Sequence, residues 1–306
     1  MEKTEFIWFD GQLVPWDQAQ VHVLTHALHY GSAVFEGIRA YDCGEKGSGV
    51  FRLREHAERL VNSAKILRMN IPYTPEQICE AVLETLKANK MKSAYIRPLT
   101  FVGCNEMGVY PGKNPIQTII AVWYWGAYLG AEALERGIRV RTSSFNRIHP
   151  NTLMSKAKAA GNYVNSILAK IEAVEDGYDE AIMLDTNGLV AEATGENIFI
   201  VRDGVIKTPP LACNLAGITR NSLIQVARDN GVMVKVQPFS RDEIYCADEA
   251  FFTGTAAELT PIREVDHRVI GTGKAGPITK RLQKKFFKVV HGEDEAYENW
   301  ITRYEV

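Results

Sequence analysis

The sequence has few cysteines and no long apolar run. Its five cysteines, among 306 residues, form no C-x-x-C pair, and this usage is typical of a reducing cytoplasm rather than of a disulfide framework. The longest apolar stretch, 118–131, is shorter than the roughly 20 residues that a membrane-spanning helix needs. The N-terminal segment MEKTEFIWFDG lacks the apolar core of a signal peptide. We therefore expect a cytoplasmic protein.

The sequence also lacks an excess of charge of either sign. Lys and Arg number 35 against 37 Asp and Glu, which leaves a net charge of −2. A near-neutral chain lacks the positive surface that attracts nucleic acids or anionic membranes, so neither is an expected partner, and small charged metabolites remain. Hydrophobic residues make up 46% and charged residues 24%, which is typical of globular domains and excludes a disordered or coiled-coil chain.

Helix and strand signals alternate along the chain and predict a mixed α/β fold. Apolar residues recur at helical spacing in 54–67, and Thr74-Pro75 is a typical helix start. Asp10-Gly11 predicts the turn of a β-hairpin between FIWF and QLVPW. The other expected elements are strands at 93–102, 116–125, 139–144, 181–184, 198–202, 205–208, 232–236 and 249–253, and helices at 162–174, 219–230 and 277–290.

Two domains are expected at this length, because a domain usually holds about 100–200 residues. Residues 126–137 contain glycines and few strand formers, so we place the interdomain connection there. This division predicts a small α/β domain at 1–125 and a larger domain at 138–306.

Two local motifs suggest ligand chemistry but lack the context that would support it. The segment GTGKAG at 271–276 matches G-x-G-x-x-G, yet no room follows it for the strand and acid of a dinucleotide site, which favours a glycine-rich turn before a helix. His22, His26 and His29 would share a face of a helix. No cysteine or second cluster supports a metal there, so we expect histidines that serve the core and no metal site.

Two other segments carry stronger signals. Gly217-Ile218-Thr219 leads into a helix, whose N-terminal N–H groups could bind a phosphate, although Thr219 could instead cap the helix. The segment MSKAKAAGNY (154–163) places two lysines, Lys156 and Lys158, among small residues, which leave space around an amine for a flat ligand. Such a lysine forms a Schiff base only as the free amine; the alternative is a solvated lysine on a helix.

Seven dispersed segments cover nearly the whole chain in order: HALHYGSAVFEGIRAY (26–41), REHAERLVNSAK (54–65), SAYIRPL (93–99), KAAGNY (158–163), EATGENIF (192–199), GITR (217–220) and GTAAELTP (254–261). Together they resemble the class IV pyridoxal-phosphate aminotransferases, and more narrowly the branched-chain amino acid aminotransferases of bacterial type. The resemblance implies the fold of type IV enzymes. In that fold a smaller N-terminal α/β domain and a larger C-terminal domain with a barrel-like sheet hold the cofactor between them.

The resemblance also assigns residues to the cofactor, pyridoxal 5'-phosphate. Lys158 would form the Schiff base and move the proton, and Glu192 would bind the pyridine nitrogen and keep it protonated, with Glu196 as the competing candidate. A protonated ring withdraws electrons far better than a neutral one. Tyr163 would lie beside the 3' oxygen and Arg59 would contact the phosphate. The remaining expected phosphate ligands are Gly217, Ile218, Thr219 and Thr255.

Substrate residues follow from the same resemblance. Arg97 would face the pocket and bind the second carboxylate of glutamate, while aromatic walls take the branched side chain. The matching segments assign the walls to Phe35, Tyr128 and Tyr163, the α-carboxylate site to Thr255 and Ala256 with Tyr95 nearby, and the residues reaching in from a neighbouring subunit to Tyr30 and Val109.

The implied reaction is a ping-pong transamination of L-leucine, L-isoleucine or L-valine with 2-oxoglutarate, which gives the branched 2-oxo acid and L-glutamate. The implied assembly is at least a homodimer, with a hexamer as a higher alternative. On the same fold, D-amino-acid aminotransferases, (R)-amine transaminases and aminodeoxychorismate lyases share Lys158 and Glu192 and stay open as alternatives. A cofactor-free binding protein is the rival from another class.

Overall fold

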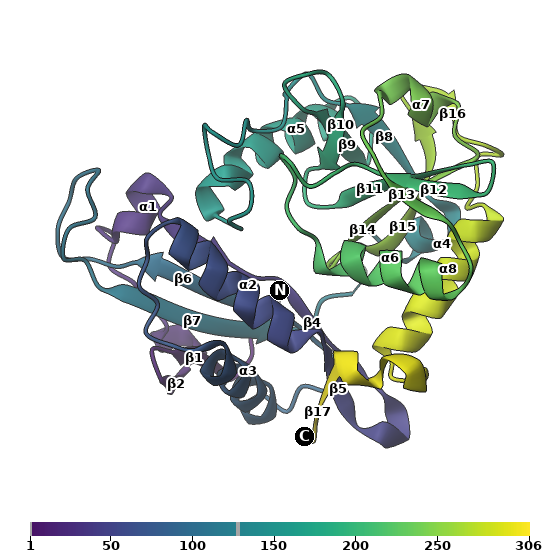
Figure 1. Ribbon diagram of the computed structural model, residues 1–306. Helices are drawn as coiled ribbons and strands as arrows, with labels where there is room; N and C mark the ends of the chain where they lie inside the picture. Colours follow the sequence, from purple (N-terminus) through teal and green to yellow (C-terminus); the bar gives the residue numbers. More distant parts are fainter. Residues whose placement is uncertain (1, 127–128) are drawn as a thin grey trace. The chain divides into compact units, whose positions relative to one another are not determined.

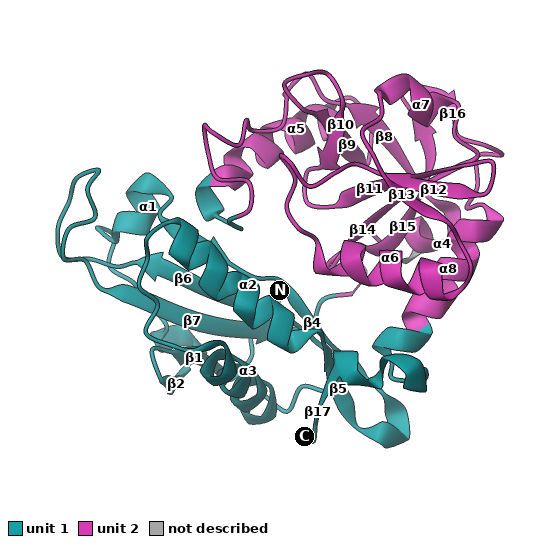
Figure 2. Ribbon diagram, in the orientation of Figure 1, with its two compact units in different colours: residues 1–125, 157–161, 288–306 teal, residues 126–156, 162–287 magenta. Residues whose placement is uncertain are grey.

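The computed structural model describes residues 2–126 and 129–306, and the chain divides into two compact units. Figure 2 shows unit 1 in teal and unit 2 in magenta. Residues 288–306, which the sequence placed in the second domain, group with unit 1, and so does the short segment 157–161. Unit 1 comprises residues 1–125, 157–161 and 288–306, and unit 2 comprises residues 126–156 and 162–287.

Unit 1 is built on an eight-stranded sheet of described residues, with the order β17-β5-β4-β6-β7-β1-β2 and β3 paired to β6 (Figure 1). All its pairings are antiparallel. The final strand of the chain therefore closes a sheet that the first strands begin. The strands are β1 (Phe6–Phe9), β2 (Gln12–Pro15), β3 (Ala33–Phe35), β4 (Ile38–Asp42), β5 (Ser48–Phe51), β6 (Ala94–Val102), β7 (Ile116–Trp123) and β17 (Ile301–Tyr304).

Two amphipathic helices, α2 (Leu53–Ile66) and α3 (Pro75–Ala88), pack on this sheet. Thr74 accepts a hydrogen bond from the main-chain N–H of Gln77, whose side chain accepts one from the N–H of Thr74. This capping box fixes the start of α3. Leu53, Val82 and Leu86 lie in the core with sheet residues such as Ile96, Ile120 and Val122. The shorter helical elements are α1 (His26–Tyr30), η1 (Trp16–Gln18), η2 (Gly44–Lys46) and η4 (Glu295–Trp300).

Unit 2 contains a nine-stranded mixed sheet of described residues, which forms a half-barrel, with the order β10-β9-β8-β15-β14-β11-β12-β13 and β16 paired to β15 (Figure 1). Strand β8 pairs in parallel with both β9 and β15. The strands are β8 (Ile138–Thr142), β9 (Glu180–Leu184), β10 (Val190–Ala193), β11 (Asn197–Arg202), β12 (Val205–Thr208), β13 (Val234–Val236), β14 (Glu249–Gly254), β15 (Glu258–Val265) and β16 (Arg268–Val269).

Helices surround this second sheet. Helix α5 packs on β9 and buries Ala169 and Ala173 against Ala181 and Met183. Helix α6 packs on β14. The helical elements are α4 (Ala131–Arg136), η3 (Ala160–Asn162), α5 (Tyr163–Glu175), α6 (Ile218–Asp229), α7 (Arg241–Tyr245) and α8 (Pro277–Val290). Within the described ranges, no helix is long and apolar enough to cross a bilayer.

The structure confirms the mixed α/β fold and the expected elements, with boundaries that shift by a few residues. The hairpin forms as predicted, with Phe9 opposite Gln12 across Asp10-Gly11. The sequence missed several strands: β3, β4, β5, β10, β15, β16 and β17. Most of these are short, and β15 contains Pro261, which is an unfavourable residue inside a strand.

A close approach of two main chains lies beside the short segment of unit 1. Gly31 ends α1 with φ +66, and a Cβ on it would lie 3.1 Å from the Cα of Gly161. The left-handed φ and the neighbouring backbone each select glycine at this position. A Cβ on Gly161 would make only ordinary contact, 3.4 Å from the Gly31 carbonyl oxygen, so the close approach constrains Gly31 more than Gly161.

We predict that Gly31→Ala lowers the free energy of unfolding more than Gly44→Ala does. Gly44 has a similar φ of +63 but no heavy atom within 4 Å of its Cβ position. Gly44→Ala should therefore cost only the left-handed strain, about 1–2 kcal/mol. Gly31→Ala should cost at least about 1 kcal/mol more because of overpacking. Urea unfolding of both variants tests this, and equal losses would contradict it.

Candidate functional site

Lys158 lies in a segment whose main chain is held by two elements of unit 1. Its N–H donates to the Ser63 side chain of α2 at 3.0 Å, and its carbonyl accepts from the N–H of Phe35 on β3 at 3.0 Å. Val34 and Ala159 form an isolated antiparallel bridge next to it. The Lys158 amine lies 4.9 Å from the centre of the Phe35 ring. The main chain of the lysine is thus held by α2 and β3.

A buried carboxylate lies directly after Phe35. Glu36 is fully buried and accepts hydrogen bonds from Arg59 Nε at 2.6 Å and Arg59 Nη2 at 2.8 Å. The Nδ1–H of His56, also buried, donates to the same carboxylate at 2.7 Å. Arg59 and His56 are one turn apart on α2. The pair of contacts fixes the guanidinium of Arg59 against the strand that leads from Phe35 into β4.

The electrostatics of this cluster favour an ionised Glu36. Burial opposes ionisation, but the charge and hydrogen bonds of Arg59, with help from His56, hold the pKa of Glu36 far below its ordinary value. Burial also lowers the pKa of His56, an effect that the Glu36 carboxylate partly offsets and the Lys158 cation strengthens. Arg59 is therefore a fixed cation in the part of unit 1 that also contains Lys158.

Three expected substrate residues meet in unit 1. The guanidinium of Arg97 lies 4.7 Å from the Phe35 ring centre and 5.5 Å from that of Tyr95, and 5.9 Å from that of Trp123. Its Nη2 donates to the Tyr95 hydroxyl at 3.4 Å, while its buried Nε has no hydrogen-bond partner. An arginine held among aromatic rings with an unused donor can bind a carboxylate next to an apolar side chain.

The other expected substrate residues of unit 1 are solvent-exposed. Tyr30 is 45% exposed at the end of α1, and Val109 is 85% exposed in the loop between β6 and β7. Their side chains are free to contact another molecule. The predicted wall residue Tyr128 lies outside the described residues.

In unit 2, Glu192 on β10 receives hydrogen bonds from three different groups. Arg147 Nε donates to Oε1 at 2.7 Å, the Asn197 side chain donates to Oε2 at 3.1 Å, and the N–H of Leu215 reaches both oxygens. Glu192 and Arg147 are both buried. These donors fix an ionised carboxylate in one orientation.

The neighbouring acid and lysine have different surroundings. Glu196 is also buried, and one of its oxygens accepts from the N–H of Gly195 at 3.1 Å. Lys156 belongs to unit 2, where its amine donates to the Asn214 carbonyl at 2.8 Å. Burial lowers the pKa of Lys156, and the negative charge of Glu192 partly offsets this. Lys156 and Lys158, two residues apart, therefore belong to different units.

The start of α6 has the form of an anion site. Gly217 is its N-cap residue, no side chain caps the helix, and its first turn holds no acid. Thr219 is inside the first turn, so the alternative that Thr219 caps this helix is wrong. A Cβ on Gly217 would meet the Asn197 side-chain oxygen at 2.0 Å. Asn197 thus contacts both the Glu192 carboxylate and this helix start, which carry the expected cofactor ligands of unit 2.

Thr255 and Ala256 lie in the tight turn between β14 and β15, where Gly254 pairs with Glu258. Both are partly exposed. Tyr163 is the first residue of α5 and is also partly exposed. Tyr163, Thr255 and Ala256 are thus at the ends of elements and partly accessible, whereas Glu192 and Thr219 are buried.

The histidine motif and the glycine-rich segment, which the sequence did not link to a ligand, have structural explanations. His26 Nε2–H donates to the Gly108 carbonyl at 2.8 Å, and His29 Nε2–H donates to the Val23 carbonyl. Helix α1 begins at His26, so His22 lies outside it. In the described part of the chain, no group of three or more His, Cys, Asp or Glu side chains could hold a metal. The segment 271–276 is a turn before α8.

Sequence reasoning missed the residues that orient the expected ligands. Glu36 and His56 lie inside segments that carried the resemblance, but their partners are about 20 positions apart in the chain and no local pattern connects them. Arg147 and Asn197 are likewise joined to Glu192 only by the fold. The one available signal was an acid, Glu36, within the apolar run AVFEGI.

We predict that Glu36→Gln lowers the free energy of unfolding by about 3 kcal/mol at pH 7, because it leaves Arg59 without its buried partner. The folded-state pKa of Glu36 lies below the ordinary 4.5. Its contribution is therefore present above pH 4.5 and is lost as the pH falls further. The difference between wild type and variant should shrink below that pH in urea unfolding series.

Glu58→Gln is the matched control for this series. Glu58 accepts from Arg54 on the same helix, and both side chains are about half exposed. Its replacement should change the free energy of unfolding by no more than about 0.5 kcal/mol. Equal effects of the two variants would refute the assigned importance of Glu36.

Comparisons with known proteins agree with this geometry. The family model described as amino-transferase class IV matches residues 33–265. The branched-chain-amino-acid aminotransferase of Pseudomonas aeruginosa is 53% identical over 301 residues, 98% of each chain. That of Escherichia coli is 50% identical over 304 residues, 99% of this chain and 98% of the relative.

Solved structures of branched-chain amino acid aminotransferases are also similar to this chain. The crystal structure of the Escherichia coli branched-chain amino acid aminotransferase has a TM-score of 0.96 at 50% identity and covers 98% of this chain and 99% of that one. The structure of the branched-chain amino acid aminotransferase from Thermoproteus uzoniensis with norvaline has a TM-score of 0.93 at 45% identity, with 98% of this chain and 99% of that one covered. The chain therefore belongs to the amino-transferase class IV family.

Proposed function

We propose that this chain transfers the amino group of L-leucine, L-isoleucine or L-valine to 2-oxoglutarate, giving the branched 2-oxo acid and L-glutamate. The observation that carries the proposal is the identity of about 50% to branched-chain-amino-acid aminotransferases over nearly the full length of both chains. Such identity covers the segments with Lys158, Arg97 and Glu192 as well as the scaffold. The arrangement of these residues gives the proposal its chemistry.

The cofactor of the proposed reaction is pyridoxal 5'-phosphate, which would withdraw electrons from the substrate Cα. Related structures contain pyridoxamine 5'-phosphate and N-(5'-phosphopyridoxyl)-L-glutamate. The residues present fit such a group. The start of α6 offers uncapped N–H groups to a phosphate, Arg59 offers a fixed cation, and the Glu192 carboxylate can accept from a ring N–H. We assign the phosphate to Arg59, Gly217, Ile218, Thr219 and Thr255.

Lys158 is the proposed catalytic residue. Its main chain is fixed by Ser63 and Phe35, so that only the side chain would move as its amine takes the proton from the substrate Cα and delivers it to C4' of the cofactor. Glu192, held by Arg147 and Asn197, would keep a proton on the ring nitrogen. Tyr163 would donate to the 3' oxygen. Lys158 and Tyr163 would thus move or donate a proton at a defined atom, and the Glu192 carboxylate would accept one from the ring N–H, as general acid–base chemistry requires.

Arg97 and its aromatic neighbours are the proposed specificity site. Phe35, Tyr95 and Trp123 surround the guanidinium, and its buried Nε has no partner. A branched side chain would pack on the rings, and the second carboxylate of glutamate would bind Arg97. Main-chain groups of Thr255 and Ala256 would bind the α-carboxylate, and Tyr30 and Val109 would come from a second subunit.

Lys158→Ala tests the catalytic assignment against its neighbour. Loss of the base should lower the rate of transamination between L-leucine and 2-oxoglutarate by about 10³-fold or more. L-leucine should no longer convert the cofactor of the loaded variant to pyridoxamine 5'-phosphate, which the absorbance spectrum measures. Lys156→Ala, two residues away, should keep both responses. If Lys156→Ala lost transamination activity and Lys158→Ala kept it, the catalytic assignment would be reversed. If the wild type did not react with L-leucine but reacted with D-amino acids or (R)-amines, the substrate assignment would be wrong.

We also propose that the protein forms a homodimer. One face of α5 is apolar and exposed: its residues are Val164, Ile167, Leu168, Ile171 and Val174, each between 42% and 60% exposed. Their spacing of three or four places them in one stripe, and a contiguous exposed apolar stripe marks an interaction site. The opposite face buries Ala169 and Ala173. A second copy on this stripe would cover a helix that begins five residues after Lys158.

Ile167→Glu should weaken self-association at least about 10-fold, because it places a charge in the apolar stripe. Sedimentation velocity over a dilution series measures the dissociation constant. Val236→Glu is the matched control, since Val236 is a comparably exposed valine (47%) on β13, away from α5. A monomeric wild type, or equal constants for both variants, would refute the dimer on this face.

A further inference from the structure

A pocket of about 930 Å³ lies within unit 2, whereas the proposed catalytic lysine belongs to unit 1. Its walls come from α4, from the start of β8, from β15, and from the turn before α8 together with α8 itself. A cavity of this size can hold a metabolite-sized ligand. The proposed transamination uses none of its lining residues.

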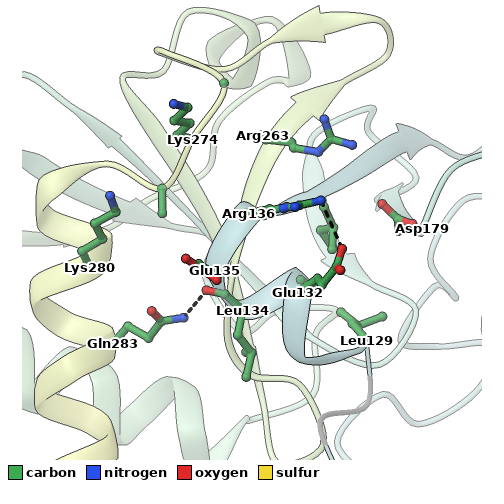
Figure 3. A pocket seen from close by; sticks show the side chains of 15 residues that line it. Leu129, Glu132, Leu134, Glu135, Arg136, Asp179, Arg263, Lys274, Lys280 and Gln283 are labelled. Atoms are coloured by element: carbon green, nitrogen blue, oxygen red, sulfur yellow. Dashed lines mark hydrogen bonds and ion pairs between the residues drawn. The ribbon is translucent and has the colours of Figure 1, made fainter.

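The charged side chains of the pocket are not balanced. Arg136 is paired with Glu132 at 3.2 Å, and the Asp179 carboxylate accepts from the main-chain N–H of Arg139. In residues 2–126 and 129–306, no carboxylate forms an ion pair with Arg263, Lys274 or Lys280. Figure 3 shows both lysines on the side of α8 and Arg263 on the side of Asp179. Glu135 also lines the pocket, so its four cationic and three acidic side chains leave a net charge of +1.

Arg263 has two further unusual features. Its Nε is buried and has no hydrogen-bond partner, whereas native structures rarely leave a buried donor unpaired. It also lies at an irregularity of β15: Ile262 pairs with Ile138 and Glu264 with Arg139, so that Arg263 has no partner on β8. Bulges of this kind redirect a side chain, often beside functional sites.

Lys274 is the lysine of the glycine-rich turn GTGKAG, which the function did not explain. Gly273 adopts a φ of +74, and Gly273, Lys274 and Ala275 all line the pocket. The main chain after this turn is fixed, because Glu249 accepts from the N–H groups of Ile278 and Thr279 at the start of α8. Lys274 is therefore presented to the pocket from a defined position.

We propose that this pocket is a second ligand site that binds a small anion with two or more negative charges, based on phosphate or carboxylate groups. Arg263 donates to the anion through the terminal N–H groups of its guanidinium, and Lys274 and Lys280 neutralise the remaining charge. The site is separate from the proposed transamination and does not depend on it.

Calorimetric titration of the cofactor-loaded protein tests the proposal, with pyrophosphate and citrate as separate probes. Saturable binding of either probe is expected, and the stronger probe identifies the anion as phosphate-based or carboxylate-based. Arg263→Gln and Lys274→Gln should each weaken binding at least about 10-fold, the loss expected for one charged hydrogen bond. Arg263→Lys should restore part of the affinity, because it keeps the charge.

Lys235→Gln is the control, since Lys235 is an exposed lysine on β13 outside the pocket. It should bind both probes as the wild type does. Lys274 lies in a turn, so its replacement changes no strand. If Arg263→Gln fails to fold, the binding affinity of Lys274→Gln still tests the proposal. Absence of saturable binding in the wild type, or an equal affinity of Lys274→Gln and Lys235→Gln for the probes, would overturn the proposal.

Discussion

The ion pair between Glu36 and Arg59 is the interaction on which the lysine-bearing part of the site depends. A fully buried carboxylate is tolerable only with several donors around it, and here two come from Arg59 and one from His56. The same contacts tie α2 to the strand that follows Phe35. Since α2 also supplies Ser63 to the main chain of Lys158, the position of the lysine and the position of the guanidinium are set by one helix.

Unit 2 also contains a buried carboxylate, Glu192, which is held by different donors. Arg147 precedes it by 45 residues and Asn197 follows it by five, so that one contact is distant and the other is made across a turn. Asn197 also fills the space beside Gly217 that a side chain there would need. A single amide thus connects the orientation of a carboxylate with the open start of α6. Both units hold an ionised acid by donors that the acid cannot lose without destabilising the fold.

The sequence was enough to predict elements that depend on residues close together in the chain. Thr74 and Gln77 are three residues apart, and their capping box could be read directly; the same holds for the Asp10-Gly11 hairpin. Glu36 could not be interpreted in this way, because its burial and its partners are determined by the packing of α2 on the sheet. Composition around Lys158 left a solvated lysine open, and only the resemblance distinguished it from Lys156. The grouping of residues 288–306 with unit 1 depends on strand pairing over most of the chain.

That pairing has a consequence for how the protein is made. Strand β5 is complete early in synthesis, yet its partner β17 is the last strand of the chain. Until residues 301–304 have been synthesised, β5 presents unpaired main-chain groups at the edge of a partly formed sheet, and such edges favour aggregation. Unit 1 therefore cannot complete its sheet until residues 301–304 are present, and their removal would leave the edge of β5 permanently open.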